Sequence, residues 1–259
     1  MNSGREIAYL SSPSSVRMAD SWFDVASLDH FWVRRRFEVL RKLAGTTIAK
    51  ARELAEIGCG SGLLQRQIEI HYGHKVTGID LNEHALKRNF SQLSPVCCYD
   101  IYEQRPALRG KFDVIFLFDV LEHVEEEDRF LAAVRYHLAA DGALLVNVPA
   151  GEWAYSNYDQ AAGHVRRYSV AALRDAAARN SFHLTEWTYW GLPFVLPLLL
   201  RKIWLRGSVG QSQIISKGFD PRTPALNWLM RVIGNCEFIP QKLIGTSVMA
   251  VLRSKPGLQ

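Results

Sequence analysis

Short apolar runs alternate along the chain with longer segments whose apolar residues recur every three to four positions. Runs of strand length separated by helical segments predict βαβ units and therefore a mostly parallel sheet. The run at 112–118 is almost wholly apolar, which is typical of a central strand covered on both faces. The predicted strands are 54–56, 75–80, 95–99, 112–118, 143–148, 182–187 and 245–253.

The residues before the first strand divide into a tail and a helix. Residues 1–15 are polar, so we expect them to be disordered or loosely attached and not to be a signal peptide. Residues 28–43 carry apolar side chains at helical spacing, and Gly45 is a plausible end for this amphipathic helix. We expect the basic residues 34–36 to form a solvated face of the helix.

Residues 190–206 depart from the alternation of strands and helices. The unbroken apolar stretch 192–200 is far shorter than the ~20 residues that cross a membrane. Tryptophan and basic residues flank it, as in a helix at a membrane surface. A core helix or a lid helix would have the same sequence pattern. A mobile loop is expected at 207–223, followed by a helix at 226–233.

These boundaries predict four parts. Residues 1–45 are a tail and a covering helix, and residues 46–189 are the core of alternating strands and helices. Residues 190–243 are an apolar and basic helical insertion, which is either a lid or a membrane-surface element. Residues 244–259 are the last strand and a tail.

Charge is distributed unevenly over the 259 residues. The net charge is +5, but residues 190–259 hold nine Lys and Arg against two Asp and Glu. This excess predicts an anionic partner for the last quarter: a membrane surface, a phosphorylated lipid or nucleic acid. The four cysteines include no C-x-x-C pair, which indicates a reduced, cytoplasmic protein, with peripheral attachment to the inner face of a membrane left open.

A glycine-rich turn joins the first strand to the next helix. The strand brings Glu56, and glycines follow at alternate positions, Gly58, Gly60 and Gly62. Glycine suits a sharp turn that must lie close to a ligand, and the helix start beyond offers free N–H groups. The G-x-G-x-G spacing differs from the G-x-G-x-x-G of dinucleotide-binding folds. It resembles the first motif of class I S-adenosylmethionine-dependent methyltransferases.

The resemblance implies a Rossmann-like, seven-stranded sheet with helices on both faces. In that family the glycine loop holds the methionine end of the cofactor, and the acid–apolar pair after strand three cradles the adenine. Asp80, at the end of strand two, takes the place of the acid that binds the ribose hydroxyls, although it could instead cap the helix that begins near Asn82. The implied S-adenosylmethionine-binding residues are Glu56, Gly58, Cys59, Gly60, Gly62, Asp80, Leu81, Asp100, Ile101 and Phe118.

Acidic and histidine residues follow the fourth strand. Asp119, Glu122 and His123 stand at i, i+3 and i+4, so one helical turn would place them on one face. His164 lies in an irregular, aromatic-rich loop at 150–169 that resembles the active-site loop of UbiG-type quinone O-methyltransferases and of bacterial type 11, 12 and 23 methyltransferases. His123 and His164 are the candidate catalytic bases.

The same four side chains are a candidate site for Mg²⁺, Mn²⁺ or Zn²⁺. UbiG-like enzymes and small-RNA 3′-end methyltransferases use a comparable set, but with glutamate in place of Asp119. The readings with and without a metal both remain open.

We therefore expect a methyltransferase that acts on an oxygen of a hydrophobic, quinone-like, or lipid- or glycan-linked small molecule. An RNA methyltransferase is the alternative enzyme, but no Asp/Asn-Pro-Pro-Tyr/Phe motif follows strand four, which argues against nucleic acid. A non-catalytic interaction protein with the cofactor fold is the alternative of another class. The intact glycine loop and Asp80 argue against it.

Overall fold

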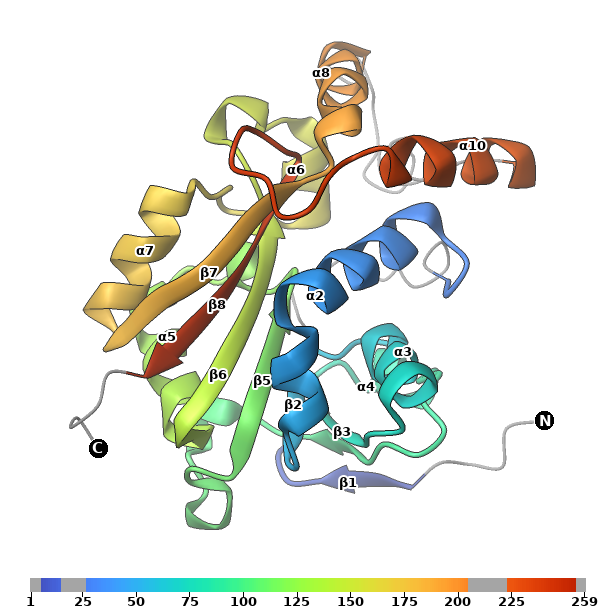
Figure 1. Ribbon diagram of the computed structural model, residues 1–259. Coiled ribbons are helices and arrows are strands. Elements are labelled where there is room, and N and C mark those ends of the chain that lie inside the picture. Colours follow the sequence, from blue (N-terminus) through green and yellow to red (C-terminus); the bar gives the residue numbers. More distant parts are fainter. Residues whose placement is uncertain (1–5, 15–26, 205–222, 255–259) are drawn as a thin grey trace.

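A computed structural model describes residues 6–14, 27–204 and 223–254. Its centre is a twisted eight-stranded sheet in the order β1-β4-β3-β2-β5-β6-β8-β7 (Figure 1). All neighbouring strands pair in parallel except β8, which runs antiparallel to both β6 and β7. The strands are β1 Ile7–Tyr9, β2 Leu54–Ile57, β3 Val76–Asp80, β4 Val96–Cys98, β5 Phe112–Phe118, β6 Leu138–Pro149, β7 Phe182–Trp190 and β8 Ser247–Ser254.

Helices cover both faces of this sheet. The α-helices are α2 Phe31–Lys50, α3 Leu63–Tyr72, α4 Glu83–Lys87, α5 Glu127–His137, α6 Asn157–Ala162, α7 Val170–Arg179, α8 Val195–Trp204 and α10 Pro224–Asn235. Short 3₁₀ turns are η1 Ile101–Glu103, η2 Pro106–Leu108, η3 Leu121–His123, η4 Glu152–Ala154 and η5 Leu192–Phe194.

Alternation along β5 divides the core into two layers. Ile115 and Leu117 pack on one face with side chains of α5 and α7, whereas Val114 and Phe116 pack on the other with α2 and α3. Successive strand residues point to opposite faces, so a strand buried on both sides must be apolar throughout. The predicted α/β fold is confirmed, with one strand more than the seven expected.

The additional strand comes from the N-terminal segment, where disorder was expected. Ile7–Tyr9 pairs in parallel with β4, and the amides of Leu10 and Ser11 both donate to the carbonyl of Cys98. The expectation was therefore wrong for residues 6–14. Backbone pairing with an open sheet edge needs no apolar pattern, so the sequence offered no signal for it.

The covering helix α2 is also longer than expected. It continues through Gly45 to Lys50, and Ala44 and Ile48 remain buried in the core. A glycine inside a helix costs about 1 kcal/mol, which the burial of a further apolar turn outweighs. Gly45 is therefore not the end of the helix.

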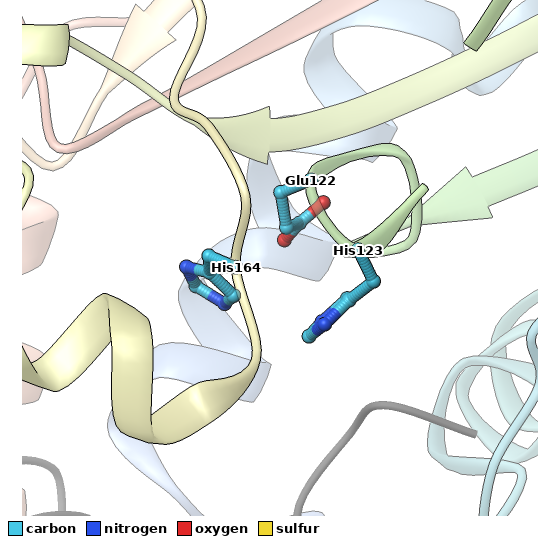
Figure 2. A group of neighbouring side chains, drawn as sticks. All are labelled: Glu122, His123 and His164. Carbon is cyan, nitrogen blue, oxygen red and sulfur yellow. The ribbon is translucent and has the colours of Figure 1, made fainter. Parts of the chain in front are cut away.

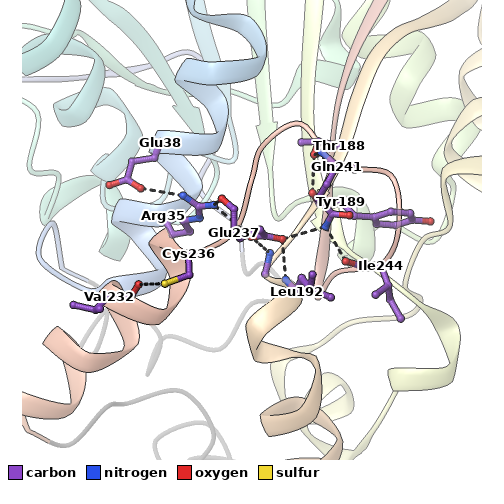
Figure 3. A network of polar contacts seen from close by, with 11 residues as sticks. Arg35, Glu38, Thr188, Tyr189, Leu192, Val232, Cys236, Glu237, Gln241 and Ile244 are labelled. Carbon is purple, nitrogen blue, oxygen red and sulfur yellow. Dashed lines mark hydrogen bonds and ion pairs between the residues drawn. The ribbon is translucent and has the colours of Figure 1, made fainter.

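A buried ion pair fastens α2 to the C-terminal insertion (Figure 3). The Arg35 guanidinium lies 3.4 Å from the Glu237 carboxylate and donates to the Glu237 backbone carbonyl at 2.9 Å. The same carboxylate accepts from the amides of Gly191 and Leu192 and from the side chain of Gln241. Only 4% of Arg35 is exposed, so the expected solvated face at residues 34–36 is wrong for Arg35.

The insertion itself forms η5, α8 and α10. The predicted apolar helix at 190–206 and the predicted helix at 226–233 are both present, whereas most of the predicted loop at 207–223 lies outside the described residues. Within the described ranges, every helix is too short or too polar to cross a membrane.

Candidate active site

The predicted cofactor residues lie at the edge of the sheet where the parallel strands end. The turn after β2 has left-handed backbone at Gly58 and Gly62, with φ of 75° and 72°. A Cβ at Gly58 would lie 2.5 Å from a methyl carbon of Val120, and one at Gly62 would lie 2.3 Å from the side chain of Asn89. Both glycines are therefore required by conformation and by space.

Asp80 holds this turn from the end of the neighbouring strand. Its carboxylate accepts from the amide of Gly60 at 2.8 Å and from the amide of Asn82 at 2.9 Å. Burial raises the pKa of Asp80 despite these hydrogen bonds. Asn82 itself caps α4 by accepting from the amide of Ala85, so Asp80 is not the helix cap.

Glu56 is buried at the end of β2 with an unsatisfied oxygen. The residue is 4% exposed, and its Oε2 has no hydrogen-bond partner among the described residues. Burial raises its pKa to about 8, which the positive charge of Arg36 opposes and the negative charge of Asp80 reinforces. A cationic group beside this oxygen would supply the missing partner, so the site fits the ammonium-bearing methionine end of the implied cofactor.

The remaining predicted cofactor residues border the same edge. Asp100 caps η1 through a hydrogen bond from the amide of Tyr102, and its own amide donates to the hydroxyl of Ser11. Ser14 donates its amide to the carbonyl of Leu81. The N-terminal segment thus contacts both places assigned to the nucleoside end, and Cys59, Ile101 and Phe118 are buried nearby in the turn, in η1 and at the end of β5.

Replacing Asp80 with alanine should weaken S-adenosylhomocysteine binding about 30-fold, or ~2 kcal/mol, because charge-assisted hydrogen bonds to the ribose are lost. Calorimetry with the cofactor product and its 2′-deoxy analogue checks this. The wild type should discriminate between the two ligands and Asp80→Ala should not, whereas Asn82→Ala, which removes the cap of α4 and keeps the Asp80 carboxylate, should retain the discrimination. Equal discrimination by the wild type and Asp80→Ala would contradict the ribose assignment.

Asp119 does not lie on one face with Glu122 and His123, as the spacing had suggested. Its backbone is left-handed, with φ of 58°, and the turn that follows is the 3₁₀ turn η3. Its carboxylate accepts instead from the guanidinium of Arg36 at 2.5 Å and from the side-chain amide of Asn147 at 2.7 Å. Arg36 is 9% exposed, so the expected solvated face is wrong here too.

Glu122, His123 and His164 do come together (Figure 2). One donor atom from each lies within 4.8 Å of the others, and the two imidazole centroids are 4.9 Å apart. Glu122 is 1% exposed, and its Oε2 has no hydrogen-bond partner within the described part of the chain. Burial, reinforced by the charge of Asp119, raises the pKa of Glu122 well above its usual range.

Asp159 fixes the orientation of His164, a role that the sequence did not reveal. The Nδ1 atom of His164 lies 2.9 Å from a carboxylate oxygen of Asp159, which also accepts from Arg167 at 2.7 Å. Burial would raise the pKa of Asp159, but the hydrogen bonds from His164 and Arg167 lower it to about 2. An ionised carboxylate accepts only, so Nδ1 carries a proton, and in the neutral imidazole the lone pair is on Nε2.

The backbone orients His123 in a similar way. Its Nδ1 atom lies 3.2 Å from the carbonyl oxygen of Gly163, which can only accept a hydrogen bond. Val165 also donates its amide to the carbonyl of Glu122, which ties the loop after α6 to η3. Val120 packs against the glycine turn at Gly58, and η3, which carries Glu122 and His123, begins at the next residue.

Comparison with known proteins identifies the class of domain that carries this site. Residues 55–146 match the model of the methyltransferase domain family. The tocopherol O-methyltransferase of Arabidopsis thaliana is 25% identical over 57% of this chain and 45% of its own length. The ubiquinone biosynthesis O-methyltransferase of Caulobacter sp. (strain K31) is 31% identical over 43% of this chain and 45% of its own. The chain thus spans less than half the length of these curated relatives.

A solved structure extends the likeness to most of the chain. The S-adenosylmethionine-dependent methyltransferase of Archaeoglobus fulgidus superposes with a TM-score of 0.54 at 17% identity, over 85% of this chain and 94% of that one. At this identity the likeness concerns the fold. Residues 55–146 thus match the methyltransferase domain family, and the fold likeness supports the predicted class, the class I S-adenosylmethionine-dependent methyltransferases.

Proposed function

We propose that this protein transfers a methyl group from S-adenosylmethionine to an oxygen of a hydrophobic small molecule. The observation that carries the proposal is the Asp159–His164 pair, in which Nδ1 of the imidazole is hydrogen-bonded to a buried carboxylate and Nε2 is left for proton exchange with an acceptor. Histidine is the side chain that most often serves as a general base. Val120, directly before η3, packs against the glycine turn that follows the unsatisfied Glu56 carboxylate.

Each group has a distinct part in the proposed reaction. The cofactor, when bound, supplies an activated methyl group on a sulfonium. Glu56 and Asp80 would hold its two ends, and the glycine turn would let the backbone approach closely. His164 Nε2 would accept the proton of the acceptor hydroxyl, while the Asp159 carboxylate would stabilise the imidazolium that results.

Two observations favour a hydrophobic acceptor. The two curated relatives are named for tocopherol and for ubiquinone biosynthesis, and both of these compounds are hydrophobic. In this chain, helix α6, which directly precedes the loop with His164, packs against the apolar insertion: the Arg201 guanidinium of α8 lies 3.9 Å from the ring centroid of Tyr158 in α6. An acceptor at His164 would therefore lie close to the insertion.

A transfer assay with labelled S-adenosylmethionine tests the proposal. A polyprenylated catechol or hydroquinone should be methylated on oxygen, and the same head group without its chain should react with a lower kcat/KM. Structured RNA serves as the matched alternative acceptor. Transfer to RNA alone, or failure to bind the cofactor at micromolar concentration, would overturn the proposal.

The Glu122, His123 and His164 group also fits a divalent metal ion. Two imidazole Nε2 atoms and one carboxylate are a common ligand set for Zn²⁺ or Mn²⁺, and the Nδ1 contacts match the support that metal-bound histidines receive. An ion held there would bind and polarise adjacent acceptor oxygens.

Because a general base needs no metal, we expect activity to survive exhaustive chelation. Metal analysis by mass spectrometry before and after chelation, with activity measured in parallel, checks this expectation. Loss of activity that Mn²⁺, Mg²⁺ or Zn²⁺ restores in the wild type but not in Glu122→Gln would instead establish the metal site.

A further inference from the structure

Most of the exposed apolar side chains lie at one end of the molecule. Of the eighteen large hydrophobic side chains that are exposed among the described residues, twelve lie within residues 192–244. They belong to η5, α8, α10 and the segment after α10, which Figure 1 shows near the end of the sheet where β6 and β7 finish. So much exposed apolar surface in one region marks an interaction site.

Helix α8 is two-faced. Leu198 is 8% exposed and turns inward, whereas Leu196 and Leu200, at i and i+4, are 65% and 58% exposed. A helix at a membrane surface usually directs its basic side chains toward the lipid headgroups, but the two basic residues of α8 contact the protein. Arg201 stacks on Tyr158, and Lys202 donates to the carbonyl of Trp153 at 2.6 Å.

Helix α10 and the segment that follows it extend the apolar surface. Asn227 faces the protein, where it bonds the amide of Phe31 and the carbonyl of Asp29. The opposite side of the helix presents Trp228, which is 63% exposed, together with Leu229 and Val232. Beyond the helix, Phe238 is 90% exposed.

The positive charge of this region favours an anionic partner. Residues 192–204 and 224–244 carry four basic residues, Arg201, Lys202, Arg231 and Lys242, and one acidic residue, Glu237. Glu237 is buried and paired with Arg35, so no exposed carboxylate in these two described ranges opposes an anionic surface. A second copy of the chain would bring the same positive excess, whereas anionic lipid headgroups would neutralise it.

We propose that η5, α8, α10 and residues 238–244 form a docking surface for an anionic lipid bilayer. Leucine, tryptophan and phenylalanine side chains enter the boundary between headgroups and acyl chains, and the basic excess attracts the headgroups. The residues that contact the bilayer in this proposal differ from those that the sequence pattern suggested. Arg201 and Lys202 are turned toward the protein, and Trp228 and Phe238, which the sequence analysis did not select, are the most exposed aromatic residues of the surface.

Flotation with phosphatidylcholine vesicles that contain about one quarter phosphatidylglycerol tests the surface, without cofactor or acceptor. The wild type should float at low salt and lose binding as salt screens the attraction. Trp228→Ser with Phe238→Ser should lower the partition at least about 10-fold. The matched control, Ile70→Ser with Leu93→Ser, removes side chains that are 64% and 53% exposed outside the surface and should bind as the wild type does.

Cofactor affinity, measured by calorimetry, verifies that both double variants remain folded. A wild type that does not float at low salt would overturn the proposal. If sedimentation then shows a wild-type dimer and a monomeric Trp228→Ser/Phe238→Ser variant, the surface is an interface between copies. Because no step of this test requires methyl transfer, its result is independent of the proposed reaction.

Discussion

Replacing His164 with glutamine should lower the rate constant for methyl transfer by about 10²- to 10⁴-fold. Glutamine keeps a polar side chain of similar length, but it cannot accept a proton near neutral pH. The cofactor dissociation constant should not change, because His164 approaches from the loop after α6 and not from the glycine turn. Single-turnover measurements with a phenolic acceptor, together with calorimetry, separate the two quantities.

His123→Gln is the matched control, since this imidazole lies on the opposite side of the same group but contacts a backbone carbonyl in place of a carboxylate. A larger loss in His123→Gln than in His164→Gln would assign the base to His123. The rate constant of Asp159→Asn should lie between those of the wild type and His164→Gln, because this change weakens the stabilisation of the imidazolium without removing the imidazole.

Replacing Glu56 with glutamine should stabilise the cofactor-free protein at pH 9 by up to ~5 kcal/mol. The folded-state pKa is raised from 4.5 to about 8, so folding disfavours the ionised carboxylate. Below pH 4.5 both states are protonated and the residue has no effect. Between pH 4.5 and 8 the unfolded chain ionises first and stability falls, and above pH 8 the cost is constant.

Urea unfolding at pH 5, 7 and 9 measures this dependence. The gain of Glu56→Gln over the wild type should be largest at pH 9 and small at pH 5. Glu53→Gln, which alters an exposed carboxylate on the residue before β2 begins, should show no comparable gain. A gain that does not depend on pH would contradict the buried-carboxylate explanation.

The same variant should bind S-adenosylmethionine about 10- to 100-fold more weakly, because a hydrogen-bonded charge partner is lost. The predicted outcome for Glu56→Gln is thus a more stable protein with a lower affinity for S-adenosylmethionine. Both effects have one origin, the burial of a carboxylate whose oxygen has no partner in the described protein.

Sequence periodicity predicted the strands from β2 to β8 because burial on one or both faces imposes an apolar pattern. The glycine turn was predictable because positive φ and close packing leave few alternatives to glycine at Gly58 and Gly62. Strand β1 was not predictable, since edge pairing is made by backbone groups that every residue carries.

The contacts of the candidate catalytic residues were harder to predict from the sequence, because their partners are far apart in the chain or their sequence patterns have more than one explanation. Arg36 reaches Asp119 across 83 positions of the chain, so helical periodicity alone assigns it to a solvent-facing side. Asp159 forms a capping box with Ser156. This sequence pattern is typical of the start of a helix, so it gave no reason to expect a contact with His164. The left-handed backbone of Asp119 broke the expected helical spacing with Glu122.

The Arg35–Glu237 contact has a consequence for the order in which the molecule can assemble. These residues are 202 positions apart, and β8, the last strand, pairs with both β6 and β7 in the interior of the sheet. A chain that is synthesised from its N-terminus carries the glycine turn and the His164 loop long before residue 237 emerges. Loop closure over such distances is slow. The contact between α2 and the insertion therefore forms only after residue 237 has emerged, whereas the contact of Arg36 with Asp119 can form much earlier.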